Sequence, residues 1–276
     1  MKKLFLLYLI TFLLIGCSNK IENLEVFKLL PSVQELKFNN DFSNLNFENI
    51  KFAYSTNNSH LPIRFDFTKH VENNKQSEST IEYSIDSSLN LNQEGYTLNI
   101  LKNKIYIVAK DKVGLFYAFI TLDQLIEDSK DQNINLPIVS IKDYPLLKFR
   151  PIHIDVKHHM EKKSYYFNLI DHLAKQKING IIVEFEDKLK YELRPEVGAP
   201  DALSIEWWIE LSEYANQRNI IINPLVQGLG HASFILKHEK NKYLRDDPNS
   251  DWAFNPLNSE TYDLQFDLYL DAIKAT

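Results

Sequence analysis

The chain has 276 residues, of which 44% are hydrophobic and 12% aromatic, and it contains only seven glycines. This composition predicts a folded protein with a sizeable core and excludes a low-complexity or disordered chain. The formal net charge is −6 and the sequence pI is about 5.8, so no basic surface for nucleic acid is expected. A single cysteine excludes an intrachain disulfide and a thiolate metal cluster.

Residues 1–16 have the pattern of an export signal. Lys2 and Lys3 precede an apolar run over residues 4–15, which is too short to span a membrane. The run ends in Leu-Ile-Gly-Cys, which resembles the bacterial lipobox and implies cleavage before Cys17 and lipid attachment to it. We therefore expect a lipid-anchored protein of the bacterial cell envelope, on the outer membrane or the periplasmic face, with residues 17–23 as a tether. A simple secretory peptide with an incidental cysteine, or an uncleaved anchor, is the alternative.

Residues 24–142 are predicted to form a small α+β domain with one helix covering a sheet. Asp111 is a candidate N-cap for a helix whose apolar positions include Leu115, Phe119 and Leu122. Residues 102–104 have the pattern of a hairpin turn. The strands are expected over residues 50–54, 63–67, 81–85, 96–101 and 105–108.

Residues 146–276 alternate between strand and helix patterns. Strands are expected over residues 152–155, 181–185 and 220–226, and helices over 165–176, 207–217 and 262–274. Ser204 is a plausible cap for the second helix. The apolar positions of the third helix are Tyr262, Phe266, Tyr269, Leu270 and Ile273. Three strand–helix repeats predict parallel βαβ units with right-handed crossovers.

The predicted fold class is therefore α/β, a partial (β/α)8 TIM barrel of about three βα units preceded by the α+β domain. A complete barrel of this kind needs roughly 250 residues, so we expect residues 146–276 to be the N-terminal part of a truncated barrel. A small open α/β sheet complete in itself is the alternative.

The stretch 220–231 organises the second half of the chain. Its apolar run ends at Gln227, and we expect Gly228 and Gly230 to let the backbone turn tightly and present His231 at the end of a strand. In α/β barrels the loops after the strands carry the chemistry. His231 is therefore a candidate site residue.

Polar residues also follow the other two strands. Lys157 and His158 come after the first strand, and Glu184, Glu186 and Asp187 end the second. Strand alternation would place Glu184 and Glu186 on one face and Asp187 on the other. The alternative is that both glutamates pair with Lys157 and Lys188 at a solvated rim. No metal-ligand spacing and no phosphate-binding glycine loop occur, so neither a metal nor a cofactor is expected.

Three blocks of sequence resemble the family 20 glycoside hydrolases, the β-N-acetylhexosaminidases. Residues 114–125 are similar to the helix of the family's small α+β domain, and residues 141–157 to the entry into its first barrel strand. The most specific block comprises residues 179–187, 224–231 and 234–239, which resemble the divergent branch that includes hexosaminidase D.

This resemblance implies removal of terminal N-acetylhexosamine by a retaining mechanism, in which the acetamido group of the sugar attacks its own anomeric carbon. An Asp orients that group and a neighbouring Glu donates the proton; both follow barrel strand four, which the chain as given is expected to lack. Asp187 and His231 match two other positions of the family. By resemblance, they form a chain of hydrogen bonds to the proton-donating Glu and support its role.

The remaining candidates for sugar contacts are Lys157, His158, Glu184 and Glu186. The better-known branch of the family has an arginine where this chain has His158, and an imidazole cannot reproduce the bidentate guanidinium fork. The expected partner is a glycan containing N-acetylhexosamine, and the expected membrane contact is the lipid anchor at Cys17. The alternative function is a non-catalytic glycan-binding or scaffold lipoprotein with a degenerate barrel.

Overall fold

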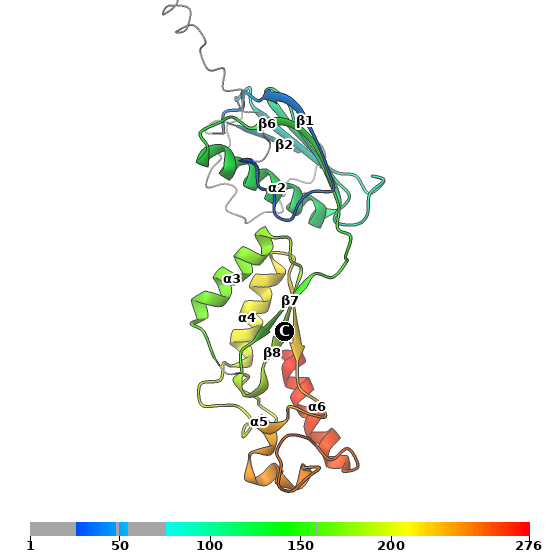
Figure 1. The fold of residues 1–276 in the computed structure, drawn as a ribbon, viewed down its shortest axis with the longest axis vertical. Coiled ribbons are helices and arrows are strands. Elements are labelled where there is room, and N and C mark those ends of the chain that lie inside the picture. Colours follow the sequence, from blue (N-terminus) through cyan, green and yellow to red (C-terminus); the bar gives the residue numbers. More distant parts are fainter. Residues whose placement is uncertain (1–25, 48–49, 55–75, 158) are drawn as a thin grey trace, which may run out of the picture.

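The computed structural model describes residues 26–47, 50–54, 76–157 and 159–276, arranged as a sheet domain followed by a set of βα units (Figure 1). The expected strand over 63–67 and the candidates Cys17 and His158 lie outside these residues. Within them, no helix has both the length and the apolar character needed to cross a membrane.

The first domain is a six-stranded mixed sheet. Its strands lie in the order β1-β6-β4-β5-β3-β2; β2, β3 and β5 pair in parallel, and the other pairs are antiparallel. The four expected strands that fall in the described residues are present, and β1 and β6 are strands that the sequence analysis did not predict. Their bounds are β1 (Glu35–Phe42), β2 (Lys51–Tyr54), β3 (Thr80–Ile85), β4 (Tyr96–Ile100), β5 (Lys104–Ala109) and β6 (Pro137–Asp143).

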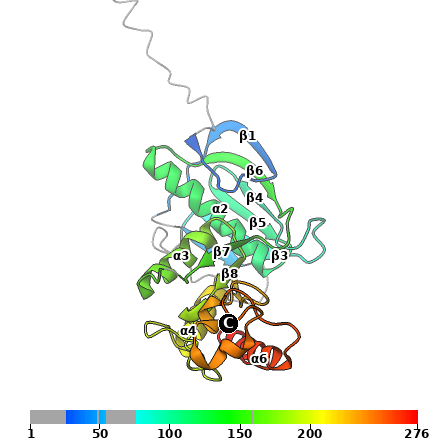
Figure 2. The ribbon, with the colours of Figure 1, turned by 60° about the horizontal axis from the view of Figure 1, so that its bottom comes forward.

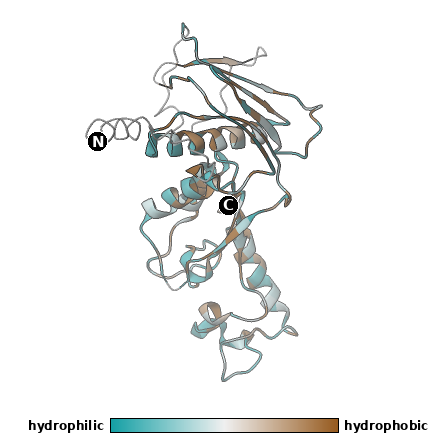
Figure 3. Cartoon of the chain, turned by 45° about the horizontal axis from the view of Figure 1, so that its top comes forward, coloured by the Kyte–Doolittle hydropathy of each residue, from teal (hydrophilic) through white to brown (hydrophobic). Residues whose placement is uncertain are grey.

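Helix α2 (Lys112–Asp131) packs across one face of this sheet (Figure 2). As predicted, Asp111 caps it, accepting a hydrogen bond from the Gly114 backbone N–H at 2.8 Å. A Cβ at Gly114 would lie 2.5 Å from the carbonyl oxygen of Gly95, so the helix can approach the sheet this closely only with glycine there. The strands and this helix carry much of the hydrophobic colour in Figure 3. They form the core of the domain.

The second part contains three parallel strands in the order β7-β8-β9, namely β7 (Pro151–Asp155), β8 (Gly180–Glu184) and β9 (Ile221–Leu225). Three longer helices follow them, α3 (Lys163–Lys175), α4 (Ile205–Asn216) and α6 (Ser259–Lys274), and α4 contacts both of the others. Ser204 caps α4 as predicted. Between strands and helices lies an apolar layer that includes Ile154, Val183, Ile222, Tyr166 and Trp208. This is the architecture of consecutive βα units of a TIM barrel.

Helix α6 buries a different face from the one its apolar positions suggest. The exposed fractions of Tyr262, Phe266 and Ile273 are 47%, 58% and 64%. The buried positions, which include Leu264 and Leu268, lie on the opposite side of the helix. The helix is therefore present as predicted, but most of the expected apolar stripe points away from the strands.

The three helices α2, α3 and α4 end in the same way, with a left-handed residue one or two positions after the C-cap. Asn133, Lys177 and Asn219 have φ values of 53°, 57° and 58°. In each case the next N–H bonds back across five residues to the last turn, as Ile178 does to Leu173 at 3.1 Å. Glycine usually occupies this position, so the lysine at 177 is unusual.

The Lys177 side chain extends into the first domain and joins the two parts of the molecule. Its Nζ donates hydrogen bonds to Asp143 Oδ2 at 2.7 Å and to the Tyr96 hydroxyl at 2.9 Å. The side chains of Lys177 and Asp143 are only 7% and 9% exposed. Burial lowers the pKa of Lys177, and the attraction of Asp143 opposes that shift. The buried pair therefore depends on both partners being present.

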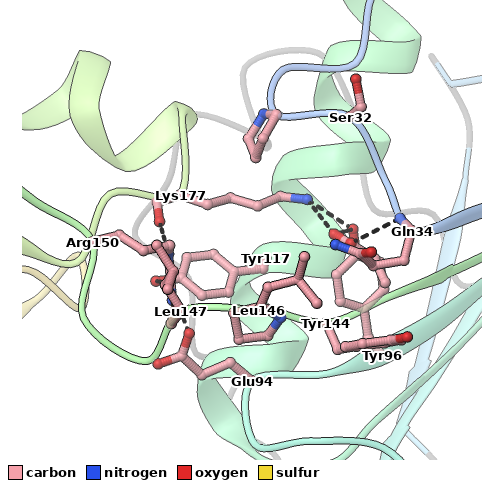
Figure 4. Close-up of a pocket in the computed structure, with 13 residues that line it drawn as sticks. Ser32, Gln34, Glu94, Tyr96, Tyr117, Tyr144, Leu146, Leu147, Arg150 and Lys177 are labelled. Carbon is pink, nitrogen blue, oxygen red and sulfur yellow. Dashed lines mark hydrogen bonds and ion pairs between the residues drawn. The ribbon is translucent and has the colours of Figure 1, made fainter.

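Arg150 makes the second connection across the junction (Figure 4). Its guanidinium donates hydrogen bonds to Glu94 Oε2 at 2.7 Å, to the Tyr117 hydroxyl at 3.1 Å and to the Lys177 carbonyl at 2.9 Å. The two ion pairs line a cavity of about 220 Å³ between the domains. The junction lies at the amino ends of β7, β8 and β9 and leaves their carboxyl ends to form a separate surface (Figure 1).

We predict that Lys177→Met lowers the free energy of unfolding by about 3–5 kcal/mol, because it leaves the Asp143 carboxylate buried without its counter-ion. Urea titration followed by circular dichroism measures this change. Lys175→Met is the matched control, since Lys175 also reaches the first domain, at Glu127, but that pair is 40% and 43% exposed. The control should lose no more than about 1 kcal/mol. Equal losses in the two variants would contradict the prediction.

Candidate functional site

Glu184, the last residue of β8, is the centre of a polar cluster at the carboxyl ends of the strands. Its Oε1 accepts hydrogen bonds from Lys157 Nζ at 3.0 Å and from Gln227 Nε2 at 2.6 Å. The other oxygen, Oε2, lies 3.1 Å from His153 Nε2. The cluster thus combines side chains from β7, β8 and the segment after β9.

Lys157 also contacts Asp155 Oδ2 at 2.8 Å, so one ammonium group joins two carboxylates. These carboxylates belong to residues that are paired across β7 and β8. Burial of Glu184 opposes its ionisation, but the hydrogen bonds from Gln227 and Lys157 and the charge of Lys157 outweigh it, so the pKa of Glu184 lies below its ordinary value. The hydrogen bonds to Asp155 and Glu184 raise the pKa of Lys157. The cluster is therefore charged at neutral pH.

The chain leaves the extended conformation directly after Glu184. Residues Glu186–Lys188 form a short 3-10 turn, and Glu186 has a φ of 42°. The prediction that Glu184 and Glu186 share one face of a strand is therefore wrong, because alternation ends with the strand. Lys157 does pair with Glu184, as the rim alternative expected. Lys188 instead bonds to Asp201 at 2.9 Å.

Asp187 connects the loop after β8 to the loop after β9. Its Oδ2 accepts a hydrogen bond from Lys237 Nζ at 3.1 Å, and its Oδ1 lies 3.5 Å from Lys188 Nζ. Lys237 directly follows α5 (Ser233–Leu236), the short helix that begins two residues after His231. The two predicted supporting residues therefore lie on loops that contact each other. In the described part of the chain no hydrogen bond joins their side chains directly.

His231 is exposed, and its backbone carries the left-handed conformation in this loop, with a φ of 56°. Neither Gly228 nor Gly230 has a positive φ, so the left-handed conformation lies at His231 and not at a glycine. The imidazole ring lies against the indole of Trp252, with ring centroids 4.2 Å apart and planes inclined by 51°. Trp252 was not among the predicted site residues.

The structure therefore separates the predicted residues into two groups. Lys157 and Glu184 meet in the cluster, which also takes in His153, Asp155 and Gln227. Asp187, Glu186 and His231 lie on the adjoining loops. His153 was not among the predicted site residues, although strand alternation in β7 places it with Asp155 on the face opposite Ile154, which packs against the helices. Within the described residues, no group of three or more His, Cys, Asp or Glu side chains could hold a metal ion.

Comparison with known proteins connects this architecture to a family. The model of glycosyl hydrolase family 20, domain 2, matches residues 28–144, which span the six-stranded sheet and α2. A Beta-hexosaminidase of Vibrio vulnificus is 28% identical over 181 residues, and Hexosaminidase D of Bos taurus is 31% identical over 113 residues. These alignments cover 54% and 41% of this chain. Residues 28–144 therefore match domain 2 of glycoside hydrolase family 20, and the chain is similar to members of that family.

The fold is similar to that of solved structures over nearly the whole chain. The β-N-acetylhexosaminidase of Streptomyces coelicolor A3(2) superposes with a TM-score of 0.74 at 16% identity, covering 91% of this chain and 58% of that one. The chitobiase of Flavobacterium johnsoniae gives a TM-score of 0.71 at 20% identity, covering 90% and 43%. The predicted fold class, a partial TIM barrel behind an α+β domain, is confirmed. The chain spans 21% and 33% of the lengths of the two sequence relatives named above.

We predict that Glu184→Gln lowers the free energy of unfolding at pH 7 by about 2 kcal/mol, because the hydrogen bonds from Lys157 and Gln227 lose their charged acceptor. The folded-state pKa of Glu184 is depressed, so this stabilisation is present above the unfolded pKa of roughly 4.3 and is lost as pH falls through the folded value. The difference between variant and wild type should therefore shrink on acidification. Urea titrations at several pH values measure it.

The matched control is Glu161→Gln, since Glu161 contacts His159 in a pair that is 42% and 76% exposed. It should change the free energy of unfolding by no more than about 0.5 kcal/mol. A Glu184→Gln effect that is the same at pH 7 and at acidic pH would show that the charge of Glu184 is not what stabilises the cluster.

Proposed function

We propose that this chain supplies the α+β domain and the first βα units of a β-N-acetylhexosaminidase that removes terminal N-acetylhexosamine from a glycan. The proposal is supported by the match of residues 28–144 to the family 20 model and by the names of the relatives, which include Beta-hexosaminidase and N,N'-diacetylchitobiase. The observation that carries it is the contact between the Asp187 loop and the His231 loop at the carboxyl ends of the strands. Site residues of TIM-barrel enzymes lie at this end.

The chemistry expected by family resemblance is a retaining, substrate-assisted hydrolysis. The acetamido oxygen of the sugar attacks the anomeric carbon, and a carboxylic acid protonates the leaving oxygen. The residues that orient the acetamido group and donate the proton are not assigned to β7, β8, β9 or the loops after them. The role proposed for Asp187 and His231 is to hold that acid in place and to tune its proton affinity through hydrogen bonds.

The cluster around Glu184 has a different role in this proposal. With Lys157 and Gln227 already engaged, its carboxylate is held in a fixed position at the rim of the sugar site, where a hydroxyl group could donate to it. Because the pKa of Glu184 is depressed, this carboxylate stays ionised at neutral pH and cannot serve as the proton donor. It is suited to binding and orientation.

We predict that Asp187→Asn and His231→Ala each lower kcat/KM of the native gene product by about tenfold or more, because both support the proton donor. Release of p-nitrophenol from the β-N-acetylglucosaminide and β-N-acetylgalactosaminide measures the rate. His172→Ala is the control histidine, since His172 is exposed in the last turn of α3, at the other end of the strands. Unchanged rates in both site variants would remove these two assignments.

The same assay distinguishes the alternative function. A wild-type protein that releases no p-nitrophenol from either glycoside, yet binds N-acetylglucosamine, would be a non-catalytic glycan-binding lipoprotein. A wild-type protein that neither hydrolyses nor binds these sugars would contradict both functions.

We further propose that the protein is a lipoprotein of the bacterial cell envelope, attached through Cys17, because residues 14–17 resemble a lipobox after a short apolar run. Cells fed a palmitate analogue should label the wild-type protein and not Cys17→Ser, and only the wild type should partition into detergent. Absence of label in the wild type would leave the simple secretory signal as the explanation of residues 1–16.

A further inference from the structure

Trp252 differs from the other two tryptophans of the chain in its surroundings. Trp207 and Trp208 lie in α4 and are 6% and 0% exposed, so they are part of the apolar layer between helices and strands. Trp252 is 53% exposed and lies on the long connection between β9 and α6. Exposing half of a large aromatic side chain to water is unfavourable. Such side chains are enriched at the surfaces where proteins bind ligands or partners.

The backbone around Trp252 is held firmly against the His231 loop. The Ala232 N–H donates a hydrogen bond to the Trp252 carbonyl at 3.0 Å, and the Phe254 N–H donates to the Leu229 carbonyl at 3.0 Å. Ser233 Oγ adds a hydrogen bond to Asp251 Oδ1 at 2.9 Å. The side chain of Phe254, 2% exposed, anchors the segment in the core. The position of the indole is therefore set by the fold.

The indole ring lies beside His231 and over the loop before it. The ring centroids of Trp252 and His231 are 4.2 Å apart. A Cβ on Gly230 would lie 3.5 Å from the indole Nε1, so this ring packs close to the loop backbone. Within the described residues, no side chain or carbonyl accepts a hydrogen bond from that Nε1. The ring therefore presents both an apolar surface and a free N–H donor.

This aromatic surface belongs to the same end of the sheet as the Glu184 cluster. Gln227, whose side chain bonds to Glu184, precedes His231 by four residues, a reach of at most about 14 Å of extended chain. Leu229, in the same loop, is 67% exposed and extends the apolar surface. An indole with a free donor beside an imidazole, at the end of the sheet that also carries carboxylate and amide groups, fits a ligand with one apolar face and a rim of hydroxyl groups. A pyranose ring has this chemistry.

We propose that Trp252 is a sugar-binding residue of this site, whose indole stacks on the apolar face of an N-acetylhexosamine unit and contacts His231 with its other side. This inference rests on the proposed function for the choice of sugar. It assigns to Trp252 a role in substrate affinity, whereas Asp187 and His231 are expected to act on the rate of proton transfer.

Because Trp207 and Trp208 are buried, fluorescence quenching can be used to test Trp252 selectively. In the native protein, acrylamide should quench mainly the fluorescence of the exposed indole, and N,N'-diacetylchitobiose should protect it, whereas glucose should not. Trp252→Phe should lose the protected component of the emission. Quenching that is unchanged by N,N'-diacetylchitobiose would overturn the proposal, whether or not the protein is an active hydrolase.

Kinetics give the second arm of the test. Trp252→Ala should raise KM for N,N'-diacetylchitobiose about tenfold and change kcat less than about threefold, whereas Trp252→Phe should stay within about threefold of the wild-type KM. An active wild type with an unchanged KM in Trp252→Ala would overturn the role of Trp252 alone. A wild type that protects Trp252 on sugar binding but hydrolyses nothing would sink the proposed hydrolase function and leave the sugar contact standing.

Discussion

Parallel pairing of β7, β8 and β9 is the constraint on which the site depends. In-register pairing places Asp155 directly opposite Glu184, and Glu184 opposite Leu225. Two carboxylates on adjacent strands repel each other unless a cation lies between them. Lys157 occupies that position, 2.8 Å from one carboxylate and 3.0 Å from the other. The lysine therefore allows two carboxylates to lie side by side at the carboxyl ends of the strands. The three loops of the candidate site begin at these ends.

The ion pairs at the two ends of these strands connect different parts of the molecule. At the amino ends, Lys177 and Arg150 form ion pairs with Asp143 and Glu94 of the sheet domain, and the Lys177–Asp143 pair is nearly inaccessible to solvent. At the carboxyl ends, the ion pairs stay within the βα units: Lys157 joins Asp155 to Glu184, whose side chain is 5% exposed. Removing one partner of a buried pair is costly, whereas exposed pairs contribute little to stability. The ion pairs at the amino ends therefore join the two domains, whereas those at the carboxyl ends hold the strand ends and loops of the candidate site together.

Much of this arrangement could be predicted from local sequence. The caps at Asp111 and Ser204 and the spacing of apolar residues in α2, α3 and α4 located the helices, because those patterns are set within a few residues. Strand β1 was missed because six of its eight side chains are exposed, so it has almost no apolar alternation to detect. Strand β6 does alternate, with Val139 and Ile141 buried and Ser140 exposed, and this signal could have revealed it.

Other features depend on contacts between distant segments and were not predictable locally. The apolar residues of α6 predicted the helix, but the surface it packs against decided which face is buried, and Leu264 and Leu268 make that contact. The sequence analysis expected strand alternation to continue past Glu184, because nothing in residues 184–187 indicates the change to 3-10 geometry. Trp252 was missed as a site residue because its neighbour His231 lies 21 positions earlier.

At some of the residues with a positive φ, the contacts of the side chain offset the conformational cost of the backbone. A non-glycine residue with positive φ is held against a cost of about 1–2 kcal/mol, and asparagine tolerates it best. Asn133 and Asn219 end their helices. Lys177 occupies the equivalent position after α3, and its side chain also places a positive charge at the domain junction. His231 adopts the same conformation next to two glycines that do not. Its imidazole is exposed and contacts an exposed indole, so the conformation there is not explained by burial. The conformation places the imidazole beside Trp252 in the loop after β9, as the proposed sugar site requires.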